Sequence, residues 1–191
     1  MPYYEVRHDI NLSMTQKDTL AAAITHIHSQ KFTTIKNFVN VRFVDVSNTD
    51  TYVGGRRRPS NMIFAHVRTG PSRTQADWDA LTAELNQAWN DIVVNQPLPQ
   101  AKGAPEPDRS LRAVFVVGSI LGGSEAGLML PAAGKDGEWL EGNWAEMKRR
   151  ADAGEREWVE NVKDVEDRGL LDGSGGAKVS LVYFHADDSV C

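Results

Sequence analysis

Apolar residues in the first part of the chain repeat with two different periods. Residues 3–8 are rich in aromatic and β-branched side chains and contain no breaker, which predicts a short strand. Apolar residues then recur at helical spacing: Leu20, Ala23, Ile24 and Ile27. This spacing, behind a capping-box pattern at Ser13–Gln16, predicts a helix over about 15–30. Alternating apolar and polar residues over 38–46 predict a second strand.

The same order of elements follows once more. Residues 62–67 and 111–118 have strand-like composition, and Ser72–Gln75 again resembles a capping box. Between them, apolar residues mark the buried face of a second helix: Trp78, Leu81, Leu85, Ala88 and Ile92. The pattern therefore predicts two consecutive β-α-β repeats, over about 2–60 and 61–120.

Two such repeats predict a two-layer fold of the α/β (α+β) class. Because a β-α-β connection is right-handed, both repeats can build one four-stranded sheet with both helices on one face. The other face of the sheet would remain uncovered. We therefore expect self-association as the simplest way to cover it.

The remaining segments have weaker patterns. Residues 47–60 contain Gly54-Gly55 and three arginines, which predicts a loop or small hairpin. The segment 95–108 has four prolines and is interpreted as a surface insertion. Mixed charge over 139–165 predicts a helix-rich extension of the domain. With this extension, the whole domain is expected to span residues 1–169. Residues 170–191, with a Gly-rich joint and a strand-like tail, form an expected appendage.

Composition narrows the class of protein. The 191 residues are 41% hydrophobic and 25% charged, which suits a soluble globular domain. A net charge of −5 argues against nucleic acid as the main partner, and no apolar run is long enough to span a membrane. The single cysteine, Cys191, excludes an intrachain disulfide and favours the cytoplasm. Because the His, Cys, Asp and Glu residues lack metal-ligand spacing, we expect no metal cofactor.

Pro2 is the most informative residue for chemistry. Methionine followed by a small residue is normally trimmed, which would leave Pro2 with a free secondary amine. An α-amino group has an ordinary pKa of about 8, and partial desolvation lowers this value. Such an amine can act as a general base near neutral pH. The structural alternative is a loose chain end with no chemical role.

Several short motifs recur in an order and spacing that resemble a known family. They are Pro2 on the first strand, Ala22-Ile24-Thr25 leading to His28, Tyr52-Val53-Gly54-Gly55, Ile63-Phe64-Ala65-His66, Arg73, Glu125 through Leu130-Pro131, and Gly137-Glu138-Trp139. Together they resemble the tautomerase superfamily, and within it the cis-3-chloroacrylic acid dehalogenase subgroup. The resemblance runs from Pro2 to about Val165.

The resemblance implies a homotrimer whose active sites surround the terminal prolines. It implies that Pro2 is the catalytic acid or base, and that His28 supports the site. It also implies that Arg73 is one of two arginines that hold a substrate carboxylate. Glu125 would position or activate water. Ordinary structural roles remain open for these residues: a packed histidine, a solvated helix-end arginine and a loop acid.

The sequence departs from the family pattern at two positions. The first arginine of the family falls on Gly70, so Arg68 is the nearest replacement. A strand-end tyrosine of the family falls on Val116, or on Phe115 if the register slips by one, and neither can donate a hydrogen bond. We therefore expect a tautomerase or hydratase-like enzyme acting on a small carboxylate, with dehalogenation weak or absent. The alternative is a non-catalytic, trimeric ligand-binding protein of the same fold.

Overall fold

The computed structural model describes residues 1–96 and 107–171, which form two units. The first unit is Met1–Asp136 and the second begins at Gly137. Most of the expected 95–108 insertion and nearly all of the 170–191 appendage lie outside the described residues. No helix in the described part of the chain is both long and apolar enough to cross a membrane.

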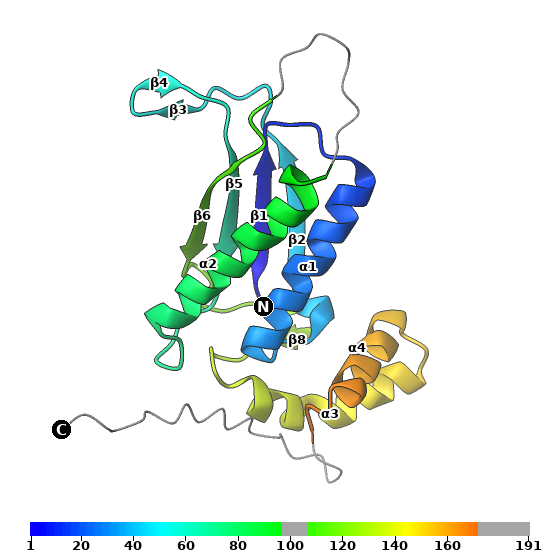
Figure 1. Cartoon of the computed structure of the whole chain (residues 1–191). Coiled ribbons are helices and arrows are strands. Elements are labelled where there is room, and N and C mark those ends of the chain that lie inside the picture. Colours follow the sequence, from blue (N-terminus) through cyan, green and yellow to red (C-terminus); the bar gives the residue numbers. More distant parts are fainter. Residues whose placement is uncertain (97–106, 172–191) are drawn as a thin grey trace, which may run out of the picture. The chain divides into compact units, whose positions relative to one another are not determined.

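A four-stranded sheet forms the base of the first unit (Figure 1). Its strands are β1 (Tyr3–His8), β2 (Asn40–Asp45), β5 (Asn61–His66) and β6 (Leu111–Val117). They lie in the order β2-β1-β5-β6. The pairs β1–β2 and β5–β6 are parallel, and the central pair β1–β5 is antiparallel. This arrangement confirms the predicted fold class of two β-α-β repeats joined into one sheet.

Two helices, α1 (Met14–Phe32) and α2 (Gln75–Trp89), cover the same face of this sheet (Figure 1). The predicted capping box of α1 is confirmed, since Ser13 Oγ accepts from Gln16 N and Gln16 Oε1 accepts from Ser13 N. The predicted start of α2 at Ser72–Gln75 was wrong by two residues. Thr74 is the N-cap, and its partner is Asp77, whose carboxylate accepts from Thr74 N at 2.8 Å.

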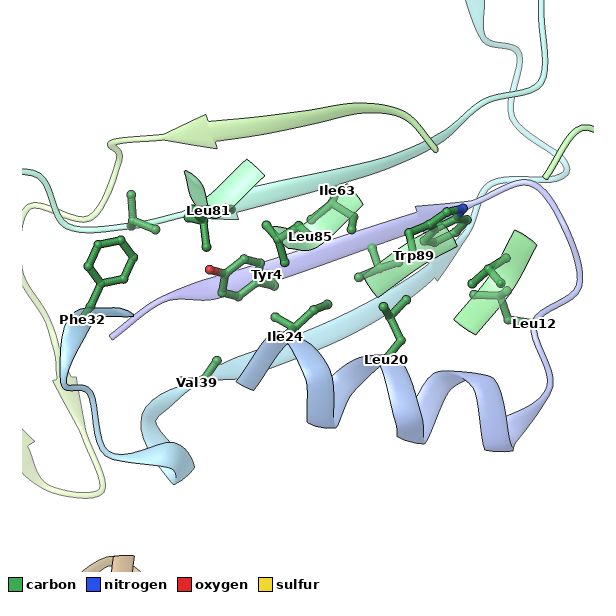
Figure 2. Packing of buried hydrophobic residues seen from close by; sticks show 14 of the residues in the cluster. Tyr4, Leu12, Leu20, Ile24, Phe32, Val39, Ile63, Leu81, Leu85 and Trp89 are labelled. Carbon is green, nitrogen blue, oxygen red and sulfur yellow. The ribbon is translucent and has the colours of Figure 1, made fainter. Parts of the chain in front are cut away.

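The hydrophobic core lies between these helices and the sheet (Figure 2). Along β1, Tyr4, Val6 and His8 are buried, which follows the period of two expected for a strand. Leu20 and Ile24 of α1 and Leu81 and Leu85 of α2 are fully buried against them, as their helical spacing predicts. Trp89, which the pattern analysis did not select, is also fully buried, and its indole donates to Arg109 O at 2.8 Å.

The opposite face of the sheet is not covered by any described element of the first unit. By alternation, the side chains on the side away from Tyr4 belong to this face: on β1 Tyr3, Glu5 and Arg7, on β5 Met62, Phe64 and His66, and on β6 Ala113, Phe115 and Val117. Phe64 and Phe115 lie in ring contact at 5.3 Å, and 48% of the Phe115 surface is exposed. Arg7 lies over the Phe64 ring at 4.5 Å.

Short elements complete the first unit. A turn of 3₁₀ helix, Lys36–Phe38, precedes β2, and helix α2 continues as a π-helical turn, Asn90–Val94. The expected hairpin in 47–60 is formed by β3 (Tyr52–Val53) and β4 (Arg56–Arg57). Gly54 and Gly55 both have positive φ, which this two-residue turn requires. A second small hairpin pairs β7 (Ser124–Glu125) with β8 (Leu128–Met129).

The second unit is helical, as predicted for 139–165. It contains most of α3 (Asp136–Asp152) and all of α4 (Arg156–Asp167). Between the helices, Arg150 pairs with Glu155 at 2.6 Å and lies over the Trp158 ring at 4.5 Å. The first residue of α3, Asp136, belongs to the first unit.

Candidate active site

The strand pairing brings distant parts of the chain to the end of the sheet where β1 begins. Because β1 and β5 are antiparallel, Tyr3 lies opposite His66, and Pro2 is therefore beside the segment that follows β5. Because β1 and β2 are parallel, Tyr3 also lies opposite Asn40, and Asn40 N donates to Pro2 O at 3.2 Å. The sheet thus fixes the first residues of the chain from both sides.

The helices and loops reach the same end of the sheet. Helix α1 runs back along β1, so its last turns, with His28 and Phe32, lie near the start of that strand (Figure 1). Arg68 and Arg73 lie between the end of β5 and the start of α2. The segment that follows β6, which contains Glu125 and Asp136, leaves from this end as well, because β6 is parallel to β5.

A small cavity of about 10 Å³ lies where these segments meet. Its lining includes four of the five residues predicted to form the site: Pro2, His28, Arg68 and Arg73. Met1 also lines it and is 8% exposed, so the first residue fills part of this space. A volume of this size has room for about one water molecule. Phe32, Thr34 and Trp78 form an uncharged part of the wall.

The amino group of the chain is buried in this cavity. The pKa of the Met1 amine is lowered from its ordinary value of 8.0 to about 5, mainly by burial and next by the nearby positive charge of Arg68. The negative charges of Asp136 and Glu125 act in the opposite direction, and Arg73 adds to the lowering. An amine with this pKa is neutral at pH 7 and can accept a proton.

Glu125 lies beside the cavity without lining it. Its Oε1 accepts a hydrogen bond from Asn40 Nδ2 at 2.9 Å, and Asn40 N in turn donates to Pro2 O. The carboxylate sits in the β7–β8 hairpin, where Ala126 and Gly127 turn the chain with positive φ. The β2 strand therefore links Glu125 to the start of β1 through the single residue Asn40.

His28 is buried and neutral. Its pKa is lowered from 6.5 to about 3, mainly by burial and also by the positive charges of the chain amine, Arg73 and Arg68. Its Nδ1 shares a hydrogen bond of 2.8 Å with the Tyr4 hydroxyl, whose own pKa is raised by burial. Figure 2 shows this hydroxyl pointing toward the end of the core where Phe32 lies. The imidazole also packs against the Phe32 ring at 4.7 Å.

Arg68 is held on several sides. Its Nη1 donates to the carbonyl oxygens of Pro131 and Ala132, and its Nη2 donates to Asp136 Oδ1 at 2.6 Å. The side chain is 9% exposed. These bonds tie the segment before α3 to the end of β5, so the guanidinium has a structural task in addition to its place in the cavity wall.

Arg73 is held more loosely. Its guanidinium lies over the Phe32 ring at 4.3 Å, and its Nη2 is 3.9 Å from Asp136 Oδ2, too long for a hydrogen bond. The side chain is 16% exposed, and burial is the main cause of its lowered pKa. Arg73 directly precedes the N-cap of α2, where backbone N–H groups also favour an anion.

Three residues at this site were not selected from the sequence. Tyr4 could have been found, because strand alternation places it on the same face as Pro2. Asn40 and Asp136 carry no local signal, since their roles depend on strand pairing and on the path of the 118–136 segment. The expected tyrosine position is occupied by Val116, which packs toward the helices, while Phe115 lies on the opposite face. His66, also on that face, bonds Ser119 Oγ at 3.0 Å.

The part of the chain that the structure describes contains no group of three or more His, Cys, Asp or Glu residues suited to a metal ion. The absence of a cofactor stays a prediction.

Known structures share this fold. A member of the cis-3-chloroacrylic acid dehalogenase family aligns with a TM-score of 0.53 and 21% identity, covering 72% of this chain and 90% of that one. A fused 4-OT solved as a symmetric trimer aligns with a TM-score of 0.49 and 20% identity, over 69% and 98% of the two chains. MIF2 from Leishmania major aligns with a TM-score of 0.47 and 14% identity, covering 68% of this chain and 97% of that one. The first of these comparisons supports the tautomerase fold.

The sequence itself also defines the family. The profile of the family described as putative oxalocrotonate tautomerase enzyme matches residues 1–147. The chain therefore belongs to this family, within the tautomerase superfamily, as the motif order had indicated. No curated protein sequence matches the chain.

Proposed function

We propose that this protein is a tautomerase or hydratase-like enzyme that uses the amine of Pro2 as acid or base on a small carboxylate substrate. The observation that carries the proposal is that Pro2 lines a cavity together with Arg68 and Arg73, at a place where burial and the two arginines bring the pKa of the neighbouring Met1 amine to about 5. Buried amines and guanidinium groups in one cleft are typical of active sites. Membership of a tautomerase family adds support.

The proposal requires removal of Met1. Trimming turns the Pro2 nitrogen from a tertiary amide, which has no basic lone pair, into a secondary amine. It also vacates the part of the cavity that Met1 fills. The cavity would then accept a short acid in place of about one water molecule.

We expect burial at this end of the sheet to lower the pKa of a free Pro2 amine as it lowers that of the Met1 amine, and a neutral amine favours tautomerisation. The neutral Pro2 amine would take the proton of an enol hydroxyl and deliver it to the carbon at the other end of the enol. The amine is neutral again afterwards, and the substrate neither gains nor loses a proton. Arg73 would hold the substrate carboxylate through charge-assisted hydrogen bonds. His28, neutral and bonded to Tyr4, would support the cavity wall without adding charge.

Hydration of an unsaturated acid is the related reaction. Glu125 would accept a proton from water as its oxygen adds to the β carbon, and the Pro2 amine, which this reaction requires in its protonated form, would give its proton to the α carbon. The same geometry would replace halide on a haloacrylate. Because no tyrosine hydroxyl occupies position 115 or 116, we expect dehalogenation to be weak or absent.

A non-catalytic ligand-binding protein is the competing function. The hydrogen bonds that commit Arg68 to the 131–136 segment favour it, because they give that arginine a structural reason to be present. Titration of Pro2 in the processed protein separates the two functions. A pKa well below the ordinary amine value, with turnover of an enol, supports the enzyme. A basic, unreactive amine supports the binding protein.

We also propose a homotrimer. The opposite sheet face carries the Phe64 and Phe115 rings beside the Glu5–Arg7 ion pair, and a second copy of the chain would remove the two rings from water. Sedimentation at micromolar concentration should give a trimer, and a stable monomer would contradict the proposal. The cytoplasmic location stays a prediction.

The direct test is turnover by the purified, processed protein. Spectrophotometry should show conversion of a 2-hydroxy-2,4-dienoate, which is an enol, into its keto form, and NMR should report hydration of an unsaturated acid. If neither class of acid reacts at rates above those in buffer, the enzyme proposal is wrong.

A further inference from the structure

The carboxylate of Asp136 lies between the two arginines of the candidate site. One oxygen bonds Arg68 Nη2 at 2.6 Å, and the other is 3.9 Å from Arg73 Nη2. The side chain is 18% exposed, and its Oδ2 is a buried atom with no hydrogen-bond partner among the described residues. A carboxylate of the protein itself therefore lies beside both guanidinium groups.

The two arginines are not equivalent toward Asp136. Arg68 uses both terminal nitrogens, one on Asp136 and one on the carbonyls of Pro131 and Ala132. Arg73 Nη2 is 3.9 Å from Asp136 Oδ2 and makes no hydrogen bond to it. The N–H donors of the Arg73 guanidinium therefore remain available beside the cavity. A substrate carboxylate would therefore find Arg73 available and Arg68 already neutralised.

The rest of the cavity wall offers no replacement cation. His28 is neutral at any pH well above 3, and Phe32, Thr34 and Trp78 are uncharged. A second carboxylate on the substrate would be desolvated without a positive partner, and it would also meet the negative charge of Asp136. Burying an unpaired carboxylate is strongly unfavourable.

We propose that Asp136 is a specificity-determining residue: by holding Arg68 it leaves Arg73 as the single anchor, and it selects substrates with one carboxylate over substrates with two. This inference rests on the proposed function of the site. It assigns to Arg68 a positioning task and to Asp136 a selective one.

The test compares two enols that differ in one carboxylate, 2-hydroxy-2,4-pentadienoate and 2-hydroxymuconate. The unaltered, processed protein should have at least about a tenfold higher kcat/KM for the first, since one unpaired charge is worth that much or more. Equal or higher efficiency with 2-hydroxymuconate would overturn the inference, and this measurement needs no variant.

Asp136→Asn then removes the charge and keeps an oxygen that can accept from Arg68. The ratio of kcat/KM for the dicarboxylate over the monocarboxylate should rise about tenfold. Asp136→Glu, which restores the charge, should keep the ratio of the unaltered protein. Asp79→Asn is the matched control, because Asp79 is exposed on α2 and bonds Gln75.

A pH profile separates selection from a merely structural role. The amine faces five groups: Arg68, Arg73, His28, Asp136 and Glu125. Of these, Asp136 and Glu125 raise the pKa of the Met1 amine, with Asp136 the stronger of the two, and we expect the same direction for the Pro2 amine. In Asp136→Asn the acid limb of kcat/KM for the monocarboxylate should therefore move to lower pH, while Asp79→Asn leaves it in place.

The outcomes distinguish the inference from the function beneath it. If folded Asp136→Asn turns over both enols and the ratio of their kcat/KM values is unchanged, this inference is wrong and the proposed function stands. Absence of turnover with either enol, together with an unreactive Pro2, overturns the proposed function and this inference with it.

Discussion

A cavity lies at each end of the sheet, and the two cavities differ in volume and in the ionisable groups around them. At the start of β1, a cavity of about 10 Å³ is surrounded by buried ionisable groups, among them the chain amine and His28 with lowered pKa values. At the opposite end, a cavity of about 470 Å³ is lined by residues that follow β1 and precede β5 and β6. The site residues predicted from the sequence thus line the smaller of the two cavities.

The polar groups at the larger cavity stabilise turns. Asn61, 1% exposed, accepts from Asp9 N at 2.9 Å and donates to Ser110 O at 3.0 Å. Asp108 accepts from Ser110 N and Oγ, and these hydrogen bonds lower the pKa of its carboxyl group. These bonds connect the ends of neighbouring strands. The candidate active site is therefore marked by ionisable groups whose pKa values are shifted by burial, and not by the volume of its cavity.

Glu125→Gln should greatly slow hydration and leave tautomerisation almost unchanged. The amide keeps an oxygen that can accept from Asn40, but it cannot take a proton from water. Hydration should fall about 100-fold or more, while tautomerisation stays within about twofold. Parallel assays of both reactions on the same preparation check this. Equal losses in the two would mean that Glu125 holds the fold and does not direct water.

Arg73→Ala should mainly weaken binding of carboxylate substrates. Loss of charge-assisted hydrogen bonds of about 2 to 3 kcal/mol corresponds to a rise in KM of about 30- to 150-fold, with a smaller change in kcat. Steady-state kinetics with a monocarboxylate enol measures it. Arg112→Ala is the matched control at the larger cavity and should leave KM unchanged. An equal effect of both substitutions would remove the contrast between the two ends.

His28 should make stability depend on pH in the acid range. Because its folded pKa of about 3 lies below the ordinary 6.5, the unfolded chain binds the extra proton between these values. The contribution is fully present above pH 6.5 and is lost as pH falls toward 3, by about 1.4 kcal/mol per pH unit.

Denaturant unfolding at several pH values measures this slope. His28→Gln should remove the contribution of one proton, and His26→Gln, on the exposed side of α1, should not. The same slope in both variants would show that His28 is not the group responsible.

The sequence was sufficient for the fold because the local patterns agree with the final structure. Tyr3–His8 is a strand from end to end, and the Ser13 cap starts α1 where the pattern places it. The start of α2 was misplaced because two hydroxyl residues, Ser72 and Thr74, both precede acceptors at capping distance. Which of them caps depends on the turn closed by Arg73 N and Gly70 O at 3.0 Å.

The candidate site was only partly predictable. Pro2, His28 and Arg73 were selected by motif order and Arg68 as the nearest replacement for a missing arginine, and all four line one cavity. Asp136 could not be selected, because its contact with Arg68 joins residues far apart in the sequence and depends on how the loop after β6 returns. The charge balance of the site, unlike its residues, is a property of the folded chain.

The most direct test of the account is whether chemistry requires a free Pro2 amine. A variant with leucine inserted between Met1 and Pro2 should retain Met1 and leave the proline nitrogen as an amide. The processed protein should catalyse enol tautomerisation, with activity rising through one ionisation below the ordinary amine pKa, and a halopropiolate should label Pro2 by mass spectrometry. The variant should be inactive and unlabelled, and Pro2→Ala should fall between the two. Full activity from protein whose mass shows Met1 intact would contradict the account.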